Sequence, residues 1–358
     1  MPIVTINLAN LLHNVGVVRK YAPQSKILAM VKANAYGHGL IPISETLAPI
    51  VDALGVARLE EAIILRDHGL TIPIVIMNGV CNLDEIKLAS ELYCDLVIHT
   101  MWQANLLQQI KLIRPVKVWL KINTGMNRLG VLPEEVVSAY NQLIYSANII
   151  KPITFITHLS DADDEENPKT TRQLEQLNHI INGLEGHKSI ANSGAIVALP
   201  DTHQDWVRPG IMLYGGSPLK RVSAAKLDLK PVMTLSSYLI AINQVLAGET
   251  IGYGSTWCCS EAISMGVIAL GYGDGYPRHA ESGTPVLING RICPLVGRVS
   301  MDMITVDLTS IPDAQVGDAV ILWGEGLPAE LVAERASTVT YELFTHMVPR
   351  VKLIKYIK

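Results

Sequence analysis

The stretch KILAMVKANAYGHGLIPISETLAPIVDALGVARLEEAIILRDHGLTIPIVIM (residues 26–77) contains short apolar runs separated by longer segments of mixed polarity. The runs at 26–32, 53–57 and 72–77 are rich in Ile, Leu and Val, which is typical of buried strands. Between the last two runs, residues 58–69 repeat apolar side chains at helical spacing. This alternation of strand and helix predicts parallel β/α units.

The same alternation continues through the first part of the 358-residue chain. Further strand candidates lie at 95–98, 116–123, 153–158, 189–192 and 206–213. Eight strand-then-helix units over roughly 220 residues match a TIM (β/α)8 barrel in number and in length. We therefore expect the fold class to be α/β plus β, with the barrel at the N-terminal side.

From about Leu229 the pattern changes to short apolar runs broken by Gly and Pro, as in 284–308. Such runs predict a mainly antiparallel β domain, in which Asn289-Gly290 forms a tight hairpin. The charge-free segment 231–248 is expected to form a pair of buried strands, since its polar residues exclude a bilayer helix. The predicted domains are a barrel at 1–228 and a β-rich domain at 229–358.

The composition excludes several classes of protein. Apolar residues make up 49% of the chain and charged residues 17%, so a large core is expected and intrinsic disorder is not. The net charge of −4 comes without long runs of either sign, which argues against binding nucleic acid or an anionic membrane. Small-molecule chemistry is favoured.

The five cysteines are odd in number and form no C-x-x-C motif, which argues against a disulfide framework and a zinc cage. We expect reduced, packing cysteines and no metal. The N-terminal residues lack the basic start, apolar stretch and cleavage site of a secretory signal, so a cytoplasmic protein is expected.

The segment VKANAYGHG (31–39) places Lys32 at the end of an apolar strand. In a barrel this end faces the active site, where an amine among apolar residues and other cations has a lowered pKa and reacts with carbonyls. The alternative is a solvated lysine at a strand end.

The segment 205–218 adds glycines at the eighth strand, where barrels often bind phosphate, although a structural turn explains them equally well. Together the two segments suggest pyridoxal 5′-phosphate.

Seven motifs stand in the order and approximate spacing of bacterial alanine racemases, which the chain resembles nearly from end to end. They are VKANAYGHG (31–39), KINTGMNRLG (121–130), ANSGA (191–195), DWVRPGIMLYG (205–215), IGYG (251–254), GYGDGYPRH (271–279) and GRVSMDM (297–303). The resemblance implies a barrel followed by a β domain, pyridoxal phosphate as cofactor, and a homodimer that interconverts L-alanine and D-alanine at shared active sites.

The resemblance also implies roles for single residues. Lys32 is similar to the lysine that forms the internal aldimine and serves as base on the D-alanine side. Tyr253 is similar to the base on the L-alanine side, which the β domain of the partner subunit contributes. Racemisation needs two such bases because the proton leaves one face of Cα and returns to the other.

The remaining matched positions fall into three groups. The resemblance assigns cofactor binding to Lys32, Tyr36, His158, Ser193, Arg208, Gly210, Ile211 and Tyr341, substrate binding to Arg128, Met301 and Asp302, and the entrance to Asp163, Tyr272, Arg278 and Arg298. Arg208 would face the pyridine nitrogen, which a permanently charged guanidinium cannot protonate. Lys121 matches a lysine that is carbamylated in some members of the family, and the modification is left open because Asn123 stands where many members have aspartate.

Other readings of the sequence remain open at this point. The closest are a broad-specificity amino-acid racemase and a barrel-type decarboxylase, and a non-catalytic carrier of pyridoxal phosphate is a third. A carrier would need only Lys32 and the phosphate-binding set, so the motif at Tyr253 argues against it. The resemblance allows D-alanine to be supplied for peptidoglycan or to be catabolised.

Overall fold

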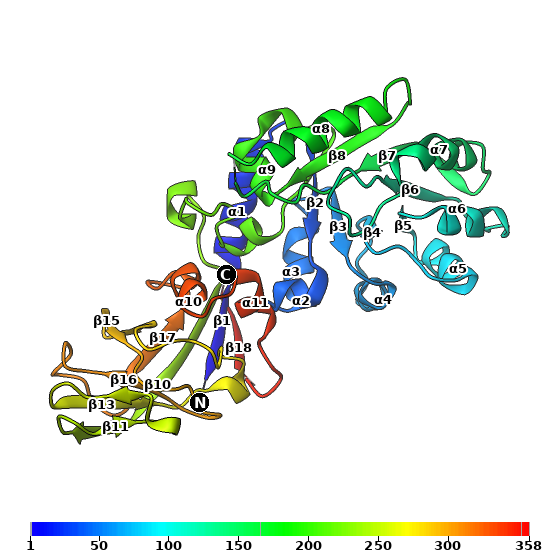
Figure 1. Ribbon diagram of the computed structural model, residues 1–358. Helices are drawn as coiled ribbons and strands as arrows, with labels where there is room; N and C mark the ends of the chain where they lie inside the picture. Colours follow the sequence, from blue (N-terminus) through cyan, green and yellow to red (C-terminus); the bar gives the residue numbers. More distant parts are fainter. Residues whose placement is uncertain (1, 165, 352, 358) are drawn as a thin grey trace.

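The computed structural model describes residues 2–164, 166–351 and 353–357. A closed barrel of eight parallel strands lies at one end of the molecule and a mainly antiparallel sheet at the other (Figure 1). The barrel strands are β2 (Lys26–Met30), β3 (Ala53–Val56), β4 (Ile74–Ile76), β5 (Cys94–Ile98), β6 (Val116–Lys121), β7 (Ile149–Ile156), β8 (His187–Asn192) and β9 (Trp206–Arg208). The predicted TIM barrel is confirmed, strand for strand.

Helices follow the strands, and most of them cover the outside of the barrel (Figure 1). They are α1 (Leu8–Tyr21), α2 (Lys32–Tyr36), α3 (Leu40–Leu47), α4 (Leu59–Asp67), α5 (Leu83–Glu91), α6 (Met101–Gln108), α7 (Val136–Ile144), α8 (Pro168–Ile180) and α9 (Ser193–Ala198). Several expected strands end early at the active-site side of the barrel. The strand expected at 206–213 stops at Arg208 because Pro209 follows it and cannot donate to the ladder.

The second part of the chain forms an eight-stranded sheet and a two-stranded ribbon. The sheet strands are β1 (Ile3–Asn7), β10 (Met233–Val245), β13 (Ile263–Ile268), β14 (Pro285–Ile288), β15 (Arg291–Pro294), β16 (Ile304–Asp307), β17 (Ala319–Trp323) and β18 (Leu353–Ile357), and the ribbon is β11 (Thr250–Ile251) with β12 (Trp257–Cys258). Two helices, α10 (Ala329–Arg335) and α11 (Thr340–Thr345), complete this part. The hairpin predicted at Asn289-Gly290 joins β14 to β15, and both turn residues have positive φ, as a tight turn of this kind requires.

Two features of the sheet differ from expectation. Segment 231–248 forms one long strand, β10, in place of a pair of strands, because it reaches across the sheet and pairs in turn with β1, β17 and β13. The first strand, β1, lies in this sheet between β10 and β18, although residues 1–228 were expected to form the barrel domain. Its alternating burial suits a sheet with one solvated face, whereas the barrel strand β3 is buried throughout. The domain boundary after residue 228 stays a prediction.

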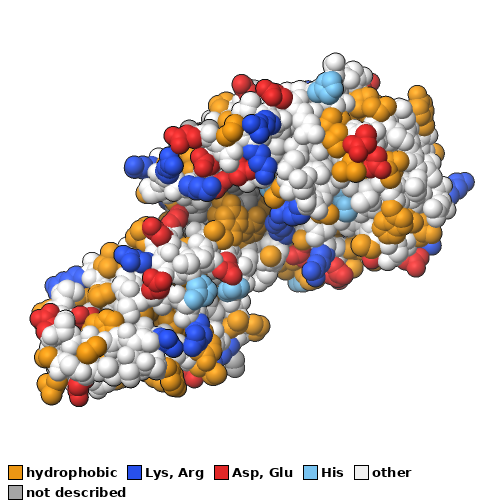
Figure 2. Space-filling view, in the orientation of Figure 1, with side chains coloured by type: hydrophobic (Ala, Val, Ile, Leu, Met, Phe, Trp, Pro, Cys, Tyr) orange, Lys and Arg blue, Asp and Glu red, His pale blue; other side chains and the backbone are white. Residues whose placement is uncertain are grey.

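The barrel and the sheet share one continuous apolar core. At their junction α11 packs against α2, which follows the first barrel strand. Figure 2 shows a waist between the two parts, with hydrophobic and basic side chains gathered on its barrel side. In the described residues no helix is both long and apolar enough to cross a membrane. All five cysteines are free thiols, but only Cys94, Cys259 and Cys293 are buried; Cys81 and Cys258 are exposed, so the expectation that every cysteine packs in the interior is wrong for these two.

A largely buried carboxyl group lies near the amino end of the barrel strand β5. Asp95, on β5, accepts a hydrogen bond from the indole of the fully buried Trp119 at 3.3 Å. Burial raises the pKa of Asp95 to about 6, although Trp119, Lys117 and Arg66 oppose the shift. Between about pH 4 and pH 6 the folded chain therefore keeps a proton on Asp95 that the unfolded chain, in which this carboxyl has a pKa of about 3.9, has released. Stability that is present below about pH 4 is lost as the pH rises through about 6.

Asp95→Asn is expected to raise the free energy of unfolding by about 1–2 kcal/mol at pH 8, because the amide still accepts from Trp119 without a buried charge. At pH 4 the gain should vanish. Urea unfolding of the variant and the parent at both pH values measures the difference. Asp84→Asn, at an almost fully exposed carboxylate on α5, is the matched control. An equal effect of Asp95→Asn at the two pH values would contradict the assignment.

Candidate active site

Lys32 lies two residues after the end of β2, at the carboxyl end of the barrel strands, where the sequence places it. The turn that follows is left-handed: Ala33, Asn34, Ala35 and Tyr36 all have φ between 52° and 55°. For residues with a Cβ this conformation costs roughly 1–2 kcal/mol each, so the surrounding structure must hold it.

Two side chains hold this strained turn. The Glu61 carboxylate on α4 accepts from the backbone N–H of Ala33 and of Ala57, each at 2.7 Å. The Asn34 amide oxygen accepts from the backbone N–H of Leu40 at 2.8 Å. The turn fixes the directions in which Lys32 and Tyr36 leave the backbone, which places both at the barrel mouth.

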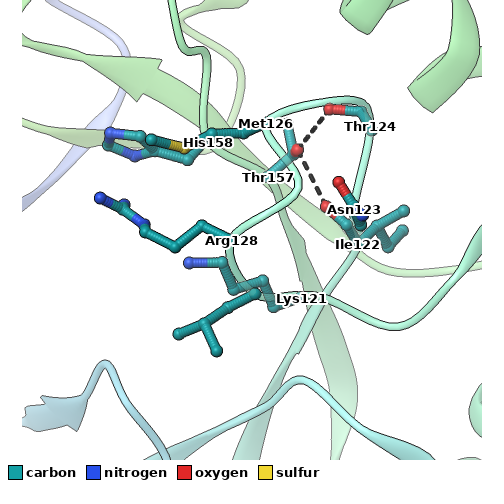
Figure 3. Close-up of a pocket in the computed structure, with 9 residues that line it drawn as sticks. Lys121, Ile122, Asn123, Thr124, Met126, Arg128, Thr157 and His158 are labelled. Carbon is teal, nitrogen blue, oxygen red and sulfur yellow. Dashed lines mark hydrogen bonds between the residues drawn. The ribbon is translucent and has the colours of Figure 1, made fainter.

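Basic side chains converge at this mouth. Lys121 ends β6, Arg128 follows in the next loop, and Figure 3 shows both pointing toward the same side of a small pocket as His158. Burial, together with Arg128 and Arg208, lowers the pKa of Lys32, and Glu61 opposes this shift. Burial and the same arginines lower the pKa of Lys121 to about 8.

His158 is held neutral by the same environment. Its pKa lies far below the usual range because the ring is buried and because Arg208, Lys121, Arg128 and Lys32 repel a further positive charge. The site therefore gathers cations whose mutual repulsion favours an anionic occupant.

Arg208 is buried at the end of β9 and is held by three oxygens. It donates to the Ser189 hydroxyl at 2.8 Å and to the backbone carbonyls of Thr157 and Ile190 at 2.6 and 3.1 Å. Burial lowers the pKa of Arg208 to about 9, so the guanidinium remains charged at neutral pH. Hydrogen bonds to neutral oxygens leave that charge without a balancing anion.

Hydroxyl groups and backbone amides gather beside these cations. The backbone N–H of Gly210 donates to the Ser193 hydroxyl at 2.8 Å, and Ile211 follows at the start of a short 3-10 helix. A Cβ at position 210 would stand 2.5 Å from the Tyr36 hydroxyl, so only glycine permits this close approach. The Tyr36 ring stacks on Tyr214 with ring centroids 4.8 Å apart.

Tyr341 closes this side of the mouth from α11, with its ring centroid 6.0 Å from that of Tyr36. Burial, assisted by the charge of Asp163, raises the pKa of Tyr341 to about 12, so its hydroxyl stays a proton donor. Asp163 itself pairs with Lys220 at 3.3 Å, at the rim of the barrel. The structure thus brings together the barrel residues that the sequence singles out, and Tyr341 joins them from the second part.

The donor set fits a phosphorylated aldehyde. The hydroxyls of Tyr36 and Ser193 suit a phosphate, which accepts several hydrogen bonds; because Ser193 accepts from the Gly210 N–H, its own proton is left to donate. An amine with a lowered pKa, such as Lys32, suits an aldehyde. The unbalanced charge of Arg208 and its neighbours suits an anion.

A second group of predicted residues lies outside this mouth, on the sheet part of the same chain. Tyr253 is 71% exposed and follows β11, which Figure 1 shows at the end of the molecule away from the barrel. A Cβ at the next residue, Gly254, would lie 3.3 Å from the Arg298 guanidinium, so Arg298 reaches this turn. The structure does not bring Tyr253 to Lys32 of its own chain.

The other members of this group are also at the surface. Met301 and Asp302 are exposed, and Asp302 forms an ion pair with Arg350, which also contacts Asp274 at 3.2 Å. Tyr272 is 37% exposed and donates its backbone N–H to the Ser300 carbonyl. The fourth entrance residue, Arg278, is exposed as well.

Several residues that shape the mouth were missed from the sequence. Glu61 looks like an ordinary acidic residue in the first turn of a helix, and only its contact with Ala33 shows its part in the turn. Ser189 and Tyr214, which contact Arg208 and Tyr36, look like strand and loop residues. No local pattern marks them, because the contacts that make them part of the mouth join residues 19 or more positions apart along the chain.

A closed parallel barrel with reactive and charged side chains at the carboxyl ends of its strands is the architecture of a barrel enzyme. The family model described as alanine racemase, N-terminal domain, matches residues 6–218, and that of the C-terminal domain matches residues 232–355. The chain belongs to the alanine racemase family, whose members are isomerases.

The similarity to known alanine racemases extends over nearly the whole chain. The alanine racemase of Aeromonas hydrophila is 48% identical over 349 residues, which cover 98% of each chain. The crystal structure of the biosynthetic alanine racemase from Pseudomonas aeruginosa has a TM-score of 0.97 and is 40% identical, covering 100% of this chain and 99% of that one. The alanine racemase structure from Bartonella henselae, with covalently bound pyridoxal phosphate, has a TM-score of 0.89 and is 27% identical, covering 99% of both chains.

Proposed function

We propose that this chain is an alanine racemase that interconverts L-alanine and D-alanine with bound pyridoxal 5′-phosphate. The observation that carries the proposal is the convergence of Lys32, Arg128 and Arg208 at the mouth of a barrel whose chain belongs to this family. We further propose a cytoplasmic enzyme that supplies D-alanine for peptidoglycan. The P. aeruginosa relative, described as biosynthetic, supports that direction.

The residues at the mouth divide the work of holding the cofactor. Lys32 would bind it covalently, and Arg208 and His158 would lie along its ring. Its phosphate would be bound by the hydroxyls of Tyr36, Ser193 and Tyr341 and by the backbone amides of Gly210 and Ile211. When bound, pyridoxal phosphate supplies an aldehyde and an electron-withdrawing ring, which together make the α-proton of an amino acid more acidic.

Proton transfer would be carried out by two residues on opposite faces of the substrate. Lys32, with its lowered pKa, takes or returns the proton on the D-alanine face. Tyr253 does the same on the L-alanine face. Arg128 binds the substrate carboxylate, and its charge favours the phenolate form of a nearby tyrosine.

This assignment requires a second copy of the chain. Tyr253 is exposed and remote from Lys32 of its own chain, so a homodimer would let each sheet part complete the partner's barrel mouth. Met301 and Asp302 would line the partner's substrate pocket. The entrance would be formed by Asp163, Tyr272, Arg278 and Arg298, whose opposite charges suit a small zwitterion.

The direct test is racemisation of L-alanine and of D-alanine by the purified holoenzyme, followed by chiral chromatography, with serine and lysine as competing substrates. We expect conversion of alanine in both directions and much slower conversion of lysine. Comparable rates on large amino acids would favour a broad-specificity racemase, and loss of carbon dioxide would favour a decarboxylase. Cofactor binding without turnover of any amino acid would identify a carrier.

We also propose that Lys121 is carbamylated. Its amine is buried among Lys32, Arg128 and Arg208, and the lowered pKa of about 8 leaves part of it neutral at neutral pH. The neutral amine adds to carbon dioxide and releases one proton, which turns a cation into an anion beside Arg128. That change removes a repulsion and gives Arg128 an anionic partner.

Native protein in ¹³C-bicarbonate is expected to show one ¹³C carbamate resonance by NMR, and Lys121→Gln is expected to lack it. Lys117→Gln, at an exposed lysine on the same strand, is the matched control and should keep the resonance. A spectrum without the resonance in the native protein would show that Lys121 stays an amine.

A further inference from the structure

Gln173 is a buried amide on α8, a helix whose neighbouring polar residues Arg172, Glu175 and Gln176 are exposed. Its oxygen accepts from the backbone N–H of Ser160 at 3.0 Å, while the single proton of the Ser160 hydroxyl is donated to the Asp161 carboxylate at 2.5 Å. Its nitrogen donates to the His158 carbonyl at 3.0 Å and to the Thr124 hydroxyl oxygen at 3.1 Å. Both N–H donors of the amide are used and its oxygen accepts a backbone N–H, so Gln173 has one orientation in this setting.

The hydrogen bonds beyond Gln173 run in one direction. The Thr157 hydroxyl donates its single proton to the Ile122 carbonyl at 3.0 Å. In the 2.7 Å contact between the hydroxyls of Thr124 and Thr157, Thr124 must therefore be the donor. Since Gln173 donates to Thr124, an ordered series passes from α8 to the end of β6, and Figure 3 shows its last two bonds.

This series joins two segments of the active site. Thr124 lies in the loop 123–130, which carries Arg128 and follows β6. The backbone carbonyl of Thr157 accepts from Arg208 at 2.6 Å, so the hydrogen-bonded pair Thr124 and Thr157 also lies beside Arg208. Gln173 thus links the loop that bears Arg128 to the end of β7.

The position of Arg128 depends on this loop. The side chain is exposed, and the loop turns sharply at Asn127 and Gly130, which have positive φ. Within the loop the Asn123 side chain accepts from the backbone N–H groups of Gly125 and Asn127, each at 3.1 Å, which shapes the loop without tying it to the barrel. The Thr124 hydroxyl, by contrast, connects the loop to Gln173 and Thr157.

We propose that Gln173, acting through Thr124, is a positioning residue that holds the loop 123–130 so that Arg128 meets the substrate carboxylate. This inference rests on the proposed function for the role of Arg128. Without the link the loop gains freedom, and the substrate must order it on binding, which weakens ground-state and transition-state binding alike.

The test uses the holoenzyme and the isosteric change Thr124→Val, which removes the hydroxyl that accepts a hydrogen bond from the Gln173 amide. We expect the KM for alanine and the inhibition constant for propionate, which is alanine without its amino group, to rise about tenfold. The kcat should change less than about threefold. Thr124→Ser restores the hydroxyl and should restore both constants. Gln173→Leu should act like Thr124→Val, and Gln176→Leu, on the exposed side of α8, should act like the parent.

A second readout is independent of activity. Backbone hydrogen exchange, followed by mass spectrometry, should be faster in residues 123–130 of Thr124→Val and Gln173→Leu than in the parent, and unchanged in Gln176→Leu. Unchanged exchange in this loop in Thr124→Val, or an unchanged KM in an active Thr124→Val enzyme, would overturn the inference. A parent enzyme that racemises no alanine would instead overturn the proposed function, and the exchange measurement would still decide whether Gln173 holds the loop.

Discussion

Lys32→Ala is expected to lower racemisation of alanine by about 10⁴-fold or more, since both the covalent attachment of the cofactor and the base on one face are lost together. Burial, Arg128 and Arg208 lower the pKa of Lys32, which suits its amine to both tasks. Chiral chromatography of the alanine pool measures the loss. The absorbance of bound cofactor should also change, because the covalent link to the protein is absent.

Two controls separate this role from a structural one. Lys26→Ala, at the exposed opposite end of β2, should leave racemisation within about threefold of the parent. Borohydride reduction of the parent holoenzyme should fix the cofactor on the peptide that contains Lys32. Recovery of the cofactor on Lys121 would show that the neighbouring amine is the one that binds it.

Much of the barrel could be predicted from the sequence because its strands carry their own signal. Strands such as β3 and β4 are buried on both faces, so they stand out as continuous apolar runs between helical segments. The strand β1 was missed because it is half-buried and pairs with β10 and β18, which lie more than 200 residues further along the chain. The tertiary structure determines which strands pair with β1, and the local sequence pattern carries no information about that pairing.

The residues of the active site, like the strands of the barrel, could be predicted only in part. Lys32 was recognisable as an amine at the end of an apolar strand, and the family resemblance supplied Arg128 and Arg208. The left-handed turn after Lys32 was not predictable, because alanine and tyrosine rarely adopt positive φ. The same holds for Gln173, whose sequence context is that of a polar surface helix.

Tyr253→Phe is expected to separate the two faces of the reaction. The variant keeps the ring and removes the phenol, so binding of the cofactor should survive. In D₂O, exchange of the α-proton of D-alanine should continue through Lys32, whereas that of L-alanine should fall by about 10²-fold or more. Proton NMR follows both exchanges, and Tyr145→Phe, at a tyrosine that is 84% exposed on the barrel, is the matched control. Equal losses for the two enantiomers would contradict a two-base assignment.

The exposed position of Tyr253 adds a test of which subunit it serves. When Lys32→Ala and Tyr253→Phe chains are mixed, a hybrid dimer with shared sites contains one site with both bases intact and one with neither. Random exchange makes half of the dimers hybrids, so about a quarter of the parent activity should return from two inactive proteins. If Tyr253 served its own chain, every site in the mixture would lack one base, and verified hybrids would stay inactive. Recovery of activity on mixing therefore requires that the two bases come from different chains, as their separation within one chain leads us to expect.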